Sequence, residues 1–498
     1  MSPRLRALAA LSVVAASLML APGAPSSTVA AKRQAGRAAI VTVGPATTGP
    51  AVAPGFAGVS MPLASLESYA GIDPAVPNTV FVQLLRNLTS GERTVLRFGG
   101  DSADRAWWPI PGMHRPASVT YTLTNRWLQV ARTLASTTNA RLILGINLMA
   151  NSPRLARAEA VAMIRGIGRR RIAALEVGNE PELYRRFSGP RATRGGRTAP
   201  SVLRSFNADF ARVADALPTI ALAGPGIGSD RWLDDLPNFM RRNPGVSVVT
   251  LHRYPLKRCS PGAQVTAAQL LSRESTEGLA HSIAASVASA RSRGLPLRID
   301  ELSTVACGGA HGVSDTFASA LWLLDTLPAL ARLGVAGVNI QMRPNSFNEL
   351  FGLERVGPRL EASVRPEYYG LLLFSEAAPP GSRMLKVNGT NGRELNVWAT
   401  RDMHGNVRVV LVNNDPAGAA IATVRIPTAS GSATLTRLQA PGLSATGDVT
   451  IGGQSFGTLT SSGVLAPGRS SIAPSQSPGA YRVSVPAASA ALLEVSAR

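Results

Sequence analysis

Eight short apolar segments, each followed by an amphipathic helical stretch, run through the sequence between about residue 55 and residue 341. These segments are Gly55–Ser60, Val95–Phe98, Leu142–Asn147, Ala173–Val177, Ala221–Ala223, Val246–Leu251, Leu297–Ile299 and Val338–Gln341. Alternating β and α segments imply a parallel sheet, and eight such units in roughly 300 residues predict an α/β fold of the (β/α)8 TIM-barrel type. A doubly wound sheet competes with it, but that fold would place a glycine-rich loop after the first strand, where Met61 and Pro62 stand instead.

The pattern changes after Pro366, where β-branched residues alternate in short runs that Gly, Asn, Asp and Pro separate. The clearest runs are Leu395–Thr400, Val407–Asn413, Ala422–Ile426 and Tyr481–Val485. Such runs predict a C-terminal β-sandwich, and we expect a strand at Ala39–Val43 to cross over and join it. The predicted organisation is an N-terminal segment at 32–50 that carries this strand, a barrel at 51–362 and a β-sandwich at 363–498.

One helix can be bounded from its own signals. Phe317 and Leu321 recur at helical spacing in the segment Asp315–Leu327. Ser314 is suited to cap this helix, and Pro328 is expected to end or kink it.

The N-terminus resembles an export signal. Arg4 and Arg6 precede the apolar stretch Ala7–Leu20, and small residues follow it. The stretch is shorter than the roughly 20 apolar residues that a spanning helix needs, so we expect a signal peptide at 1–31 rather than an uncleaved anchor. This predicts a secreted or extracytoplasmic protein with no membrane span after cleavage.

The formal net charge is +21, and lysine occurs only at Lys32, Lys257 and Lys386 among 51 basic residues. The arginines are spread along the chain, with one tight run at 169–171, and no zinc-finger spacing or RNA-binding aromatic motif accompanies them. We therefore expect no nucleic-acid partner, although the positive charge would attract an acidic polysaccharide.

The chain has two cysteines, Cys259 and Cys307, each a few residues beyond the end of a predicted strand. Disulfides persist in exported proteins, so we expect these two residues to be bonded, with two free buried thiols as the alternative.

Two glutamates stand at predicted strand exits. Glu180 follows the fourth strand in the run Gly178–Pro181, and Glu301 follows the seventh strand after Asp300. The C-terminal ends of barrel strands carry the chemistry of this fold. Two carboxyl groups at one barrel mouth are able to cleave a glycosidic bond by double displacement, one as acid/base and one as nucleophile. The competing interpretation is that both glutamates are surface charges.

Other polar residues at strand exits are candidates for substrate binding. Asn179 adjoins Glu180, and the second strand supplies Arg97, whose guanidinium would lower the pKa of a neighbouring nucleophile. Asp101 could bind sugar hydroxyls, and Trp107 is either a stacking surface or a packing residue.

The sixth strand leads into His252, Arg253 and Tyr254. Tyr254 could bond the nucleophile or a substrate carboxylate, Arg253 could bind an acidic sugar, and His252 is equally a ligand or a satisfied core residue. Glu176 lies in the middle of the fourth strand, where we expect it to be buried and paired. The five histidines show no His-Glu-x-x-His spacing, so we expect no metal and no cofactor.

Four stretches resemble glycoside hydrolase family 79, the β-glucuronidase and heparanase family within the retaining TIM-barrel glycosidases. They are Leu175–Tyr184, Arg97–Ser102, Arg298–Glu301 followed by Gly312–Asp315, and Arg365–Gly370. The resemblance implies acid/base work for Glu180, nucleophilic attack by Glu301 and a β-domain built from both chain ends.

The sugar-binding residues depart from that family in two places. Pro62 stands where relatives tend to carry an acidic residue, and Arg253 stands in the second place of their His-Tyr-Tyr-Pro. The predicted function is a monomeric, exported, retaining exo-β-glucuronidase acting on an acidic, glucuronide-type carbohydrate. The alternatives are an endo-acting or neutral-sugar β-glycosidase on the same barrel, or a non-catalytic carbohydrate-binding protein.

Overall fold

The computed structural model describes residues 39–89, 92–184, 199–357, 359–389, 395–429, 432–473 and 475–497. The predicted signal peptide lies outside these residues. Within them, no helix combines the length and the apolar character that crossing a membrane requires.

Eight parallel strands close into a barrel, in the order β11-β13-β2-β3-β6-β7-β8-β9. Their bounds are β2 (Ala57–Pro62), β3 (Val95–Gly99), β6 (Arg141–Ile146), β7 (Ile172–Val177), β8 (Leu222–Ile227), β9 (Val246–Arg253), β11 (Leu297–Leu302) and β13 (Gly337–Gln341). Each strand overlaps one of the eight predicted segments, so the predicted TIM barrel is confirmed.

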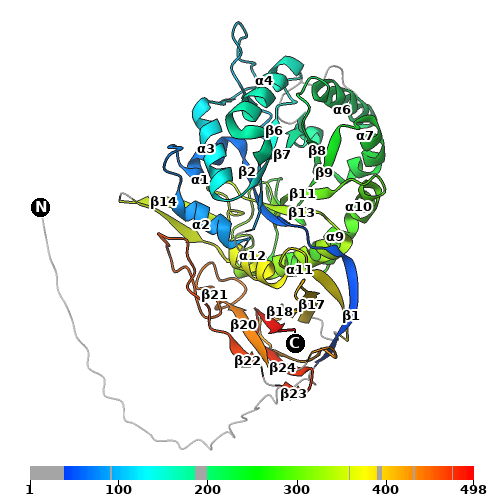
Figure 1. The fold of residues 1–498 in the computed structure, drawn as a ribbon, viewed down its shortest axis with the longest axis vertical. Helices are drawn as coiled ribbons and strands as arrows, with labels where there is room; N and C mark the ends of the chain where they lie inside the picture. The colour runs from blue at the N-terminus through cyan, green and yellow to red at the C-terminus, as the bar shows by residue number, and fades with distance from the viewer. Residues whose placement is uncertain are drawn as a thin grey trace, which may run out of the picture. The chain divides into compact units, whose positions relative to one another are not determined.

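Helices surround these strands (Figure 1). Their bounds are α1 (Leu66–Ala70), α2 (Thr79–Asn87), α3 (Asn125–Thr137), α4 (Pro153–Met163), α6 (Ala199–Ala214), α7 (Leu236–Arg242), α8 (Ala267–Leu270), α9 (Leu279–Ser282), α10 (Ala284–Arg291), α11 (Phe317–Leu333) and α12 (Pro366–Ala377).

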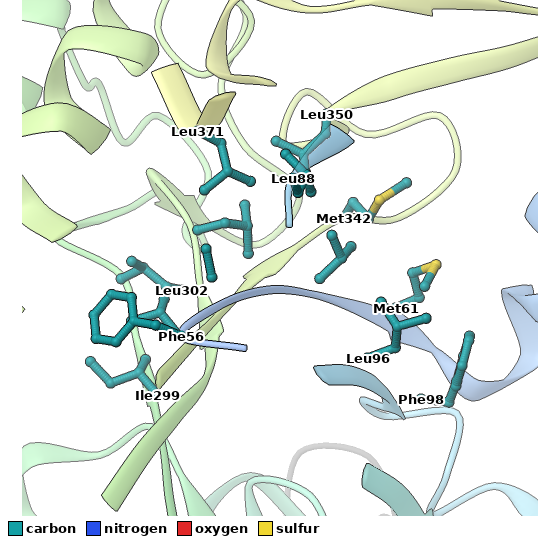
Figure 2. Close-up of a cluster of buried hydrophobic side chains, with 14 of the residues drawn as sticks. Phe56, Met61, Leu88, Leu96, Phe98, Ile299, Leu302, Met342, Leu350 and Leu371 are labelled. Atoms are coloured by element: carbon teal, nitrogen blue, oxygen red, sulfur yellow. The ribbon is translucent and has the colours of Figure 1, made fainter. Parts of the chain in front are cut away.

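Alternation along each strand separates the packing face from the polar interior of the barrel. On β3, Leu96 and Phe98 are fully buried among apolar side chains, and Phe98 meets the indole of Trp127 on α3 edge-on. Figure 2 shows Leu96 and Phe98 near Met61 of β2, within a larger cluster of buried apolar side chains. Arg97 lies between Leu96 and Phe98 in sequence and points the other way, to polar partners in the barrel.

Helix α11 begins two residues later than the predicted segment Asp315–Leu327 and does not end at Pro328. It begins at Phe317, where the backbone N–H groups of Phe317 and Ala318 donate to the carbonyl groups of Ala445 and Leu443 in the C-terminal domain. These N–H groups have no partner inside the helix, so the loop around residue 444 takes the role expected of Ser314. The helix also continues through Pro328 to Leu333, because burial of every residue from 317 to 331 offsets the hydrogen bond that proline cannot make.

The C-terminal strands form one eleven-stranded sheet, in the order β21-β20-β25-β18-β17-β16-β1-β19-β24-β23, with β22 paired to β20. Their bounds are β1 (Ala39–Ala51), β16 (Arg383–Asn388), β17 (Leu395–Arg401), β18 (Val407–Asn413), β19 (Ala420–Arg425), β20 (Ala433–Gln439), β21 (Thr450–Ile451), β22 (Ser471–Ala473), β23 (Ser475–Ser477), β24 (Ala480–Val485) and β25 (Ser489–Val495). Apolar residues from every strand of this sheet except β21 and β23 share one core, so the sheet folds over itself into the predicted sandwich.

The N-terminal strand β1 sits inside this sheet, as predicted. It pairs antiparallel with β16 and parallel with β19, so it separates two strands that come from the other end of the chain. In Figure 1 it runs, in dark blue, beside the strands of the C-terminal domain.

Buried polar contacts join the barrel to this domain. The carboxylate of Asp325 on α11 accepts hydrogen bonds from the side-chain amides of Asn396 and Asn414. The hydroxyl of Tyr369 on α12 accepts one from the backbone N–H of Phe456.

A hairpin of β14 (Phe351–Val356) and β15 (Arg359–Val364) precedes α12 in the chain.

Candidate active site

Glu180 and Glu301 lie at the C-terminal ends of β7 and β11 and face the same space. The Nδ1 atom of His252, on β9, is 3.0 Å from Oε1 of Glu180 and 3.6 Å from Oε2 of Glu301. One carboxylate oxygen of Glu180 and one of Glu301 lie within 4.8 Å of each other. The fold therefore brings together two residues that are 121 positions apart in the sequence.

The two glutamates differ in exposure and backbone conformation. The Glu180 side chain is 18% exposed, whereas that of Glu301 is 7% exposed. Glu180 adopts the left-handed conformation, with φ 41° and ψ 57°, which costs an ordinary residue roughly 1–2 kcal/mol. Its backbone N–H donates to the carbonyl of Gly226 on β8, which holds this strained turn in place.

Arg97 lies beneath both glutamates, fully buried. Its Nη1 donates to Oε1 of Glu301 at 2.5 Å and to the hydroxyl of Ser60 at 3.2 Å. Its Nε donates to Oε2 of Glu176 at 2.7 Å, and its Nη2 donates to the side-chain oxygen of Asn179 at 2.9 Å. Glu176 is buried and paired, as predicted, and this guanidinium orients side chains from three barrel strands and the turn after β7.

These contacts keep Glu301 ionised. Burial alone would raise the pKa of Glu301, but the charges of His252 and Arg97, together with the hydrogen bonds from Arg97 and Tyr254, lower it. The hydroxyl of Tyr254 donates to Oε2 of Glu301 at 2.8 Å. Both oxygens of Glu301 thus accept a hydrogen bond, and the carboxylate is fixed in one orientation.

His252 contacts both glutamates from its position at the end of β9. Its ring is fully buried and lies between the two glutamates, and its Nε2 is 3.3 Å from Nη2 of Arg97. Burial opposes the charged imidazolium, but the charge of Glu301 and the hydrogen bond with Glu180 outweigh it, so the pKa of His252 is raised.

Asp104 is a buried residue that sequence analysis missed. It accepts four hydrogen bonds, from the backbone N–H groups of Leu148, Met149 and Asn179 and from the hydroxyl of Tyr184. Burial raises its pKa to about 6 even so. Asp104 fixes the backbone next to Glu180, and its place in an irregular loop gives no periodic signal of its direction.

Asp101 stands at the exposed end of the same loop. Its Oδ1 accepts a hydrogen bond of 3.3 Å from the side-chain amide of Asn179, which links the exits of β3 and β7. Desolvation and the nearby charges of Glu301 and Glu180 raise its pKa. Asn179 and Asp101 therefore both lie near the two glutamates.

Arg253 contacts the loop after β8 and, among the described residues, makes no hydrogen bond or ion pair with Glu180 or Glu301. Its Nη1 donates to the carbonyls of His252 and Gly228, and its Nη2 is 3.7 Å from Oδ1 of Asp230. Alternation along β9 explains this position, because Arg253 points away from the face that His252 occupies.

Trp107 lies in β4 (Ala106–Trp107) and is buried. It is 7% exposed, it packs in a small apolar cluster with Val119 and Leu155, and its Nε1 donates to the hydroxyl of Thr122. The packing alternative therefore describes its contacts.

Cys259 and Cys307 form the predicted disulfide. Two short strands run beside it, β10 (Leu256–Lys257) and β12 (Val305–Ala306), which pair in parallel. The disulfide and this pair join the loop after β9, which carries Tyr254, to the loop after β11.

Among the described residues, two groups of side chains have ligand atoms close enough to hold a cation. They are Glu176 with His252 and Asp300, and Glu180 with His252 and Glu301. Arg97 already donates hydrogen bonds to Glu176 and Glu301. The guanidinium thus supplies the positive charge that a metal ion would bring to these carboxylates.

Residues 397–492 match the family model of the glycosyl hydrolase family 79 C-terminal beta domain. No curated protein sequence matches the chain closely enough to count as a relative. Among solved structures, the chain is similar to a 4-O-α-L-rhamnosyl-β-D-glucuronidase from Fusarium oxysporum 12S, with 21% identity, a TM-score of 0.73 and coverage of 92% of this chain and 100% of that one.

It is also similar to a GH51 arabinofuranosidase from Xanthomonas axonopodis pv. citri (15% identity, TM-score 0.65, 92% of this chain and 100% of that one). A further similar structure is the endoglucanase Cel44A from Clostridium thermocellum, with 11% identity, a TM-score of 0.58 and coverage of 92% of this chain and 99% of that one. At these identities the likeness concerns the fold, a barrel with a β-domain. The family match, which covers residues 397–492, confirms the predicted resemblance and the prediction of a glycoside hydrolase.

Proposed function

We propose that this chain is an exported retaining exo-β-glucuronidase in which Glu180 is the acid/base and Glu301 the nucleophile. The observation that carries this proposal is the pair of carboxyl groups at the exits of β7 and β11, with oxygens within 4.8 Å of each other. The proposed enzyme is a monomer. It uses no cofactor, because the two carboxyl groups supply the chemistry.

In the first step, Glu301 attacks the anomeric carbon while Glu180 gives its proton to the glycosidic oxygen, which leaves as an alcohol. In the second step, Glu180 takes a proton from water, and the resulting hydroxide attacks the anomeric carbon and releases Glu301 as a carboxylate. Arg97 and Tyr254 hold Glu301 ionised and oriented for the attack, and His252 holds the Glu180 carboxyl.

The spacing of the two carboxyl groups favours retention. Retaining enzymes hold them roughly 5–5.5 Å apart, whereas inverting enzymes leave about 6.5–9.5 Å for a water molecule. One oxygen of Glu180 lies within 4.8 Å of one oxygen of Glu301, and this close approach supports the shorter spacing.

The sugar assignment has two supports, the family 79 match and the likeness to the rhamnosyl-glucuronidase, whose complex contains rhamnosyl-glucuronate. Pro62 and Arg253 depart from the family pattern, and Arg253 faces Gly228 and Asp230. Preference for a neutral sugar, or endo action on an acidic polysaccharide, is the second candidate for this reason.

A panel of p-nitrophenyl β-glycosides tests the substrate. Hydrolysis led by the glucuronide supports the proposal, and hydrolysis led by the glucoside, galactoside or xyloside overturns the sugar while keeping the mechanism. If the folded protein hydrolyses none of these glycosides, the result argues for endo action or for a binding protein. Proton NMR of the first-formed product then distinguishes retention from inversion at the anomeric carbon.

Two variants test the roles of the glutamates. Glu301→Gln should abolish turnover of every glycoside, because no nucleophile remains. Glu180→Gln should lose activity most on substrates with poor leaving groups, and azide should not restore that loss. Near-native activity of Glu301→Gln would refute its role as nucleophile.

Export is proposed from the N-terminal pattern and is supported by the disulfide, which persists in oxidising compartments. Mass spectrometry of the protein recovered outside the cell tests it, with a mature N-terminus near residue 32 expected.

A further inference from the structure

Asp300 occupies a bulge in the strand that carries the proposed nucleophile. Against β9, Ile299 pairs with Leu251 and Glu301 pairs with His252, so Asp300 is an extra residue on β11. The pairing with β13 shifts at the same place. Successive residues of a strand normally point to opposite faces, and a bulge removes this restriction. Both Asp300 and Glu301 consequently approach Arg97.

The guanidinium of Arg97 has no N–H left for Asp300. Its five N–H groups have Glu176, Ser60, Glu301 and Asn179 as acceptors, with Nη2 also 2.6 Å from Oε2 of Glu176. Asp300 is fully buried and lies 3.2 Å from Nε, but neither of its oxygens accepts a hydrogen bond among the described residues.

A third buried oxygen lacks a donor in the same place. Oε1 of Glu176 has no partner within the described chain, and one oxygen of Glu176 lies within 4.8 Å of one of Asp300. A buried carboxylate without a donor is strongly destabilising, whereas a protonated carboxyl group brings its own donor. One proton between the two residues would satisfy both.

We propose that Asp300 is a positioning residue that stays protonated and donates its proton to Oε1 of Glu176. The pair then carries one negative charge, and Arg97 remains divided between Glu176 and Glu301. The groups that face Asp300 are Arg97 on β3, Glu176 on β7, His252 on β9, and Glu301 and Arg298 on its own strand. Burial and the charge of Glu176 raise the pKa of Asp300 well above its ordinary value, against the opposing charges of Arg97 and His252.

The first test is the pH dependence of stability, which needs no substrate. Asp300→Asn keeps the shape and an N–H donor but cannot ionise. A carboxyl group that is neutral only in the folded state binds one more proton there than in the unfolded chain. Between the ordinary pKa of aspartate and the raised value, the wild-type unfolding constant should therefore rise about tenfold per pH unit relative to Asp300→Asn.

Urea unfolding at a series of pH values between 4 and 8 measures this ratio. A ratio that does not change with pH would mean that Asp300 is ionised in the fold and would overturn the proposal. Failure of Asp300→Asn to fold would overturn it too, since a neutral isostere with a donor should fit. Asp300→Ala is the matched control that leaves Oε1 of Glu176 without a donor, and it should be less stable than Asp300→Asn at every pH.

The second test concerns the nucleophile and rests on the proposed function. Because Asp300→Asn removes no charge, both limbs of the pH profile of kcat/KM should stay in place. If Asp300 were instead ionised in the wild-type protein, Asp300→Asn would remove a negative charge next to Glu301 and His252 and lower the pKa of both groups. Both limbs would then move to lower pH by about one unit, and that result would overturn the proposal.

Glu176→Gln is the control for the charge of the pair. In this variant Asp300 is able to ionise against Arg97, so the double variant Glu176→Gln/Asp300→Asn should lose more activity than the two single losses combined. Simple additivity would contradict a shared proton. If no glycoside is hydrolysed at all, the proposed function fails, and the stability series still decides the protonation of Asp300.

Discussion

Tyr254→Phe isolates one contact of the proposed nucleophile. The change removes the hydroxyl that donates to Oε2 of Glu301 at 2.8 Å and leaves the ring in place. A hydrogen bond to a charged group contributes about 1.5–3 kcal/mol, which corresponds to about one to two pKa units. The contact from Arg97 to the other oxygen remains, so we expect the smaller shift of about one unit.

The sign of the shift follows from the donor. The Tyr254 hydroxyl favours the ionised form of Glu301 and so lowers its pKa, and removing the hydroxyl raises the pKa. The acidic limb of kcat/KM, below which Glu301 is protonated, should therefore move to higher pH. The value of kcat/KM at the optimum should fall on the order of tenfold to a hundredfold.

The assay is hydrolysis of the best aryl glycoside of the panel over a pH series, with thermal unfolding of the same samples. Tyr368→Phe is the matched control, because this buried tyrosine donates to the carbonyl of Leu84 and packs on Phe351 and Phe456. It should lower the unfolding temperature without moving the limb. An unmoved acidic limb in Tyr254→Phe, or a shift to lower pH, would refute the assigned contact.

Two further predictions concern stability. Replacing Cys259 and Cys307 by serine should lower the free energy of unfolding by about 4 kcal/mol in urea titrations, from the loop entropy of a 48-residue separation; an unchanged value would mean that the bond does not constrain the unfolded chain. Asp325→Ala leaves the buried amides of Asn396 and Asn414 without their acceptor and should cost about 1–3 kcal/mol. Because burial raises the pKa of Asp325 to about 7, the wild-type protein loses stability relative to this variant as pH rises from about 4 to 7, and unfolding at both ends of that range measures the difference.

The barrel could be predicted because its strands and helices repeat a local pattern eight times. Strand exits then restricted the search for functional residues to a few positions, and Glu180, Glu301, Arg97, His252 and Tyr254 meet in the structure within hydrogen-bond contact of one another. Their catalytic and binding roles remain proposals.

Other features depend on tertiary contacts and leave no local signal. The bulge at Asp300 breaks the alternation that sequence analysis assumes, so two consecutive inward carboxyl groups could not be foreseen. The start of α11 is set by carbonyl groups more than a hundred residues away, and its passage through Pro328 depends on burial. Trp107 also depends on tertiary contacts. Its position in the sequence suits either a stacking surface at the barrel mouth or a packing residue, and in the structure it packs against Leu155.

The place of β1 determines the order in which the chain is able to fold. This strand holds the first described residues of the protein, yet both of its neighbours, β16 and β19, come from the last quarter of the sequence. Contacts between such distant segments form slowly, because the chain loses the entropy of closing a long loop before the contacts stabilise it. During synthesis, β1 stays unpaired until the whole barrel has emerged, and its unpaired edges are exposed to other chains for that time. Completion of this sheet is therefore the step at which aggregation competes most directly with folding.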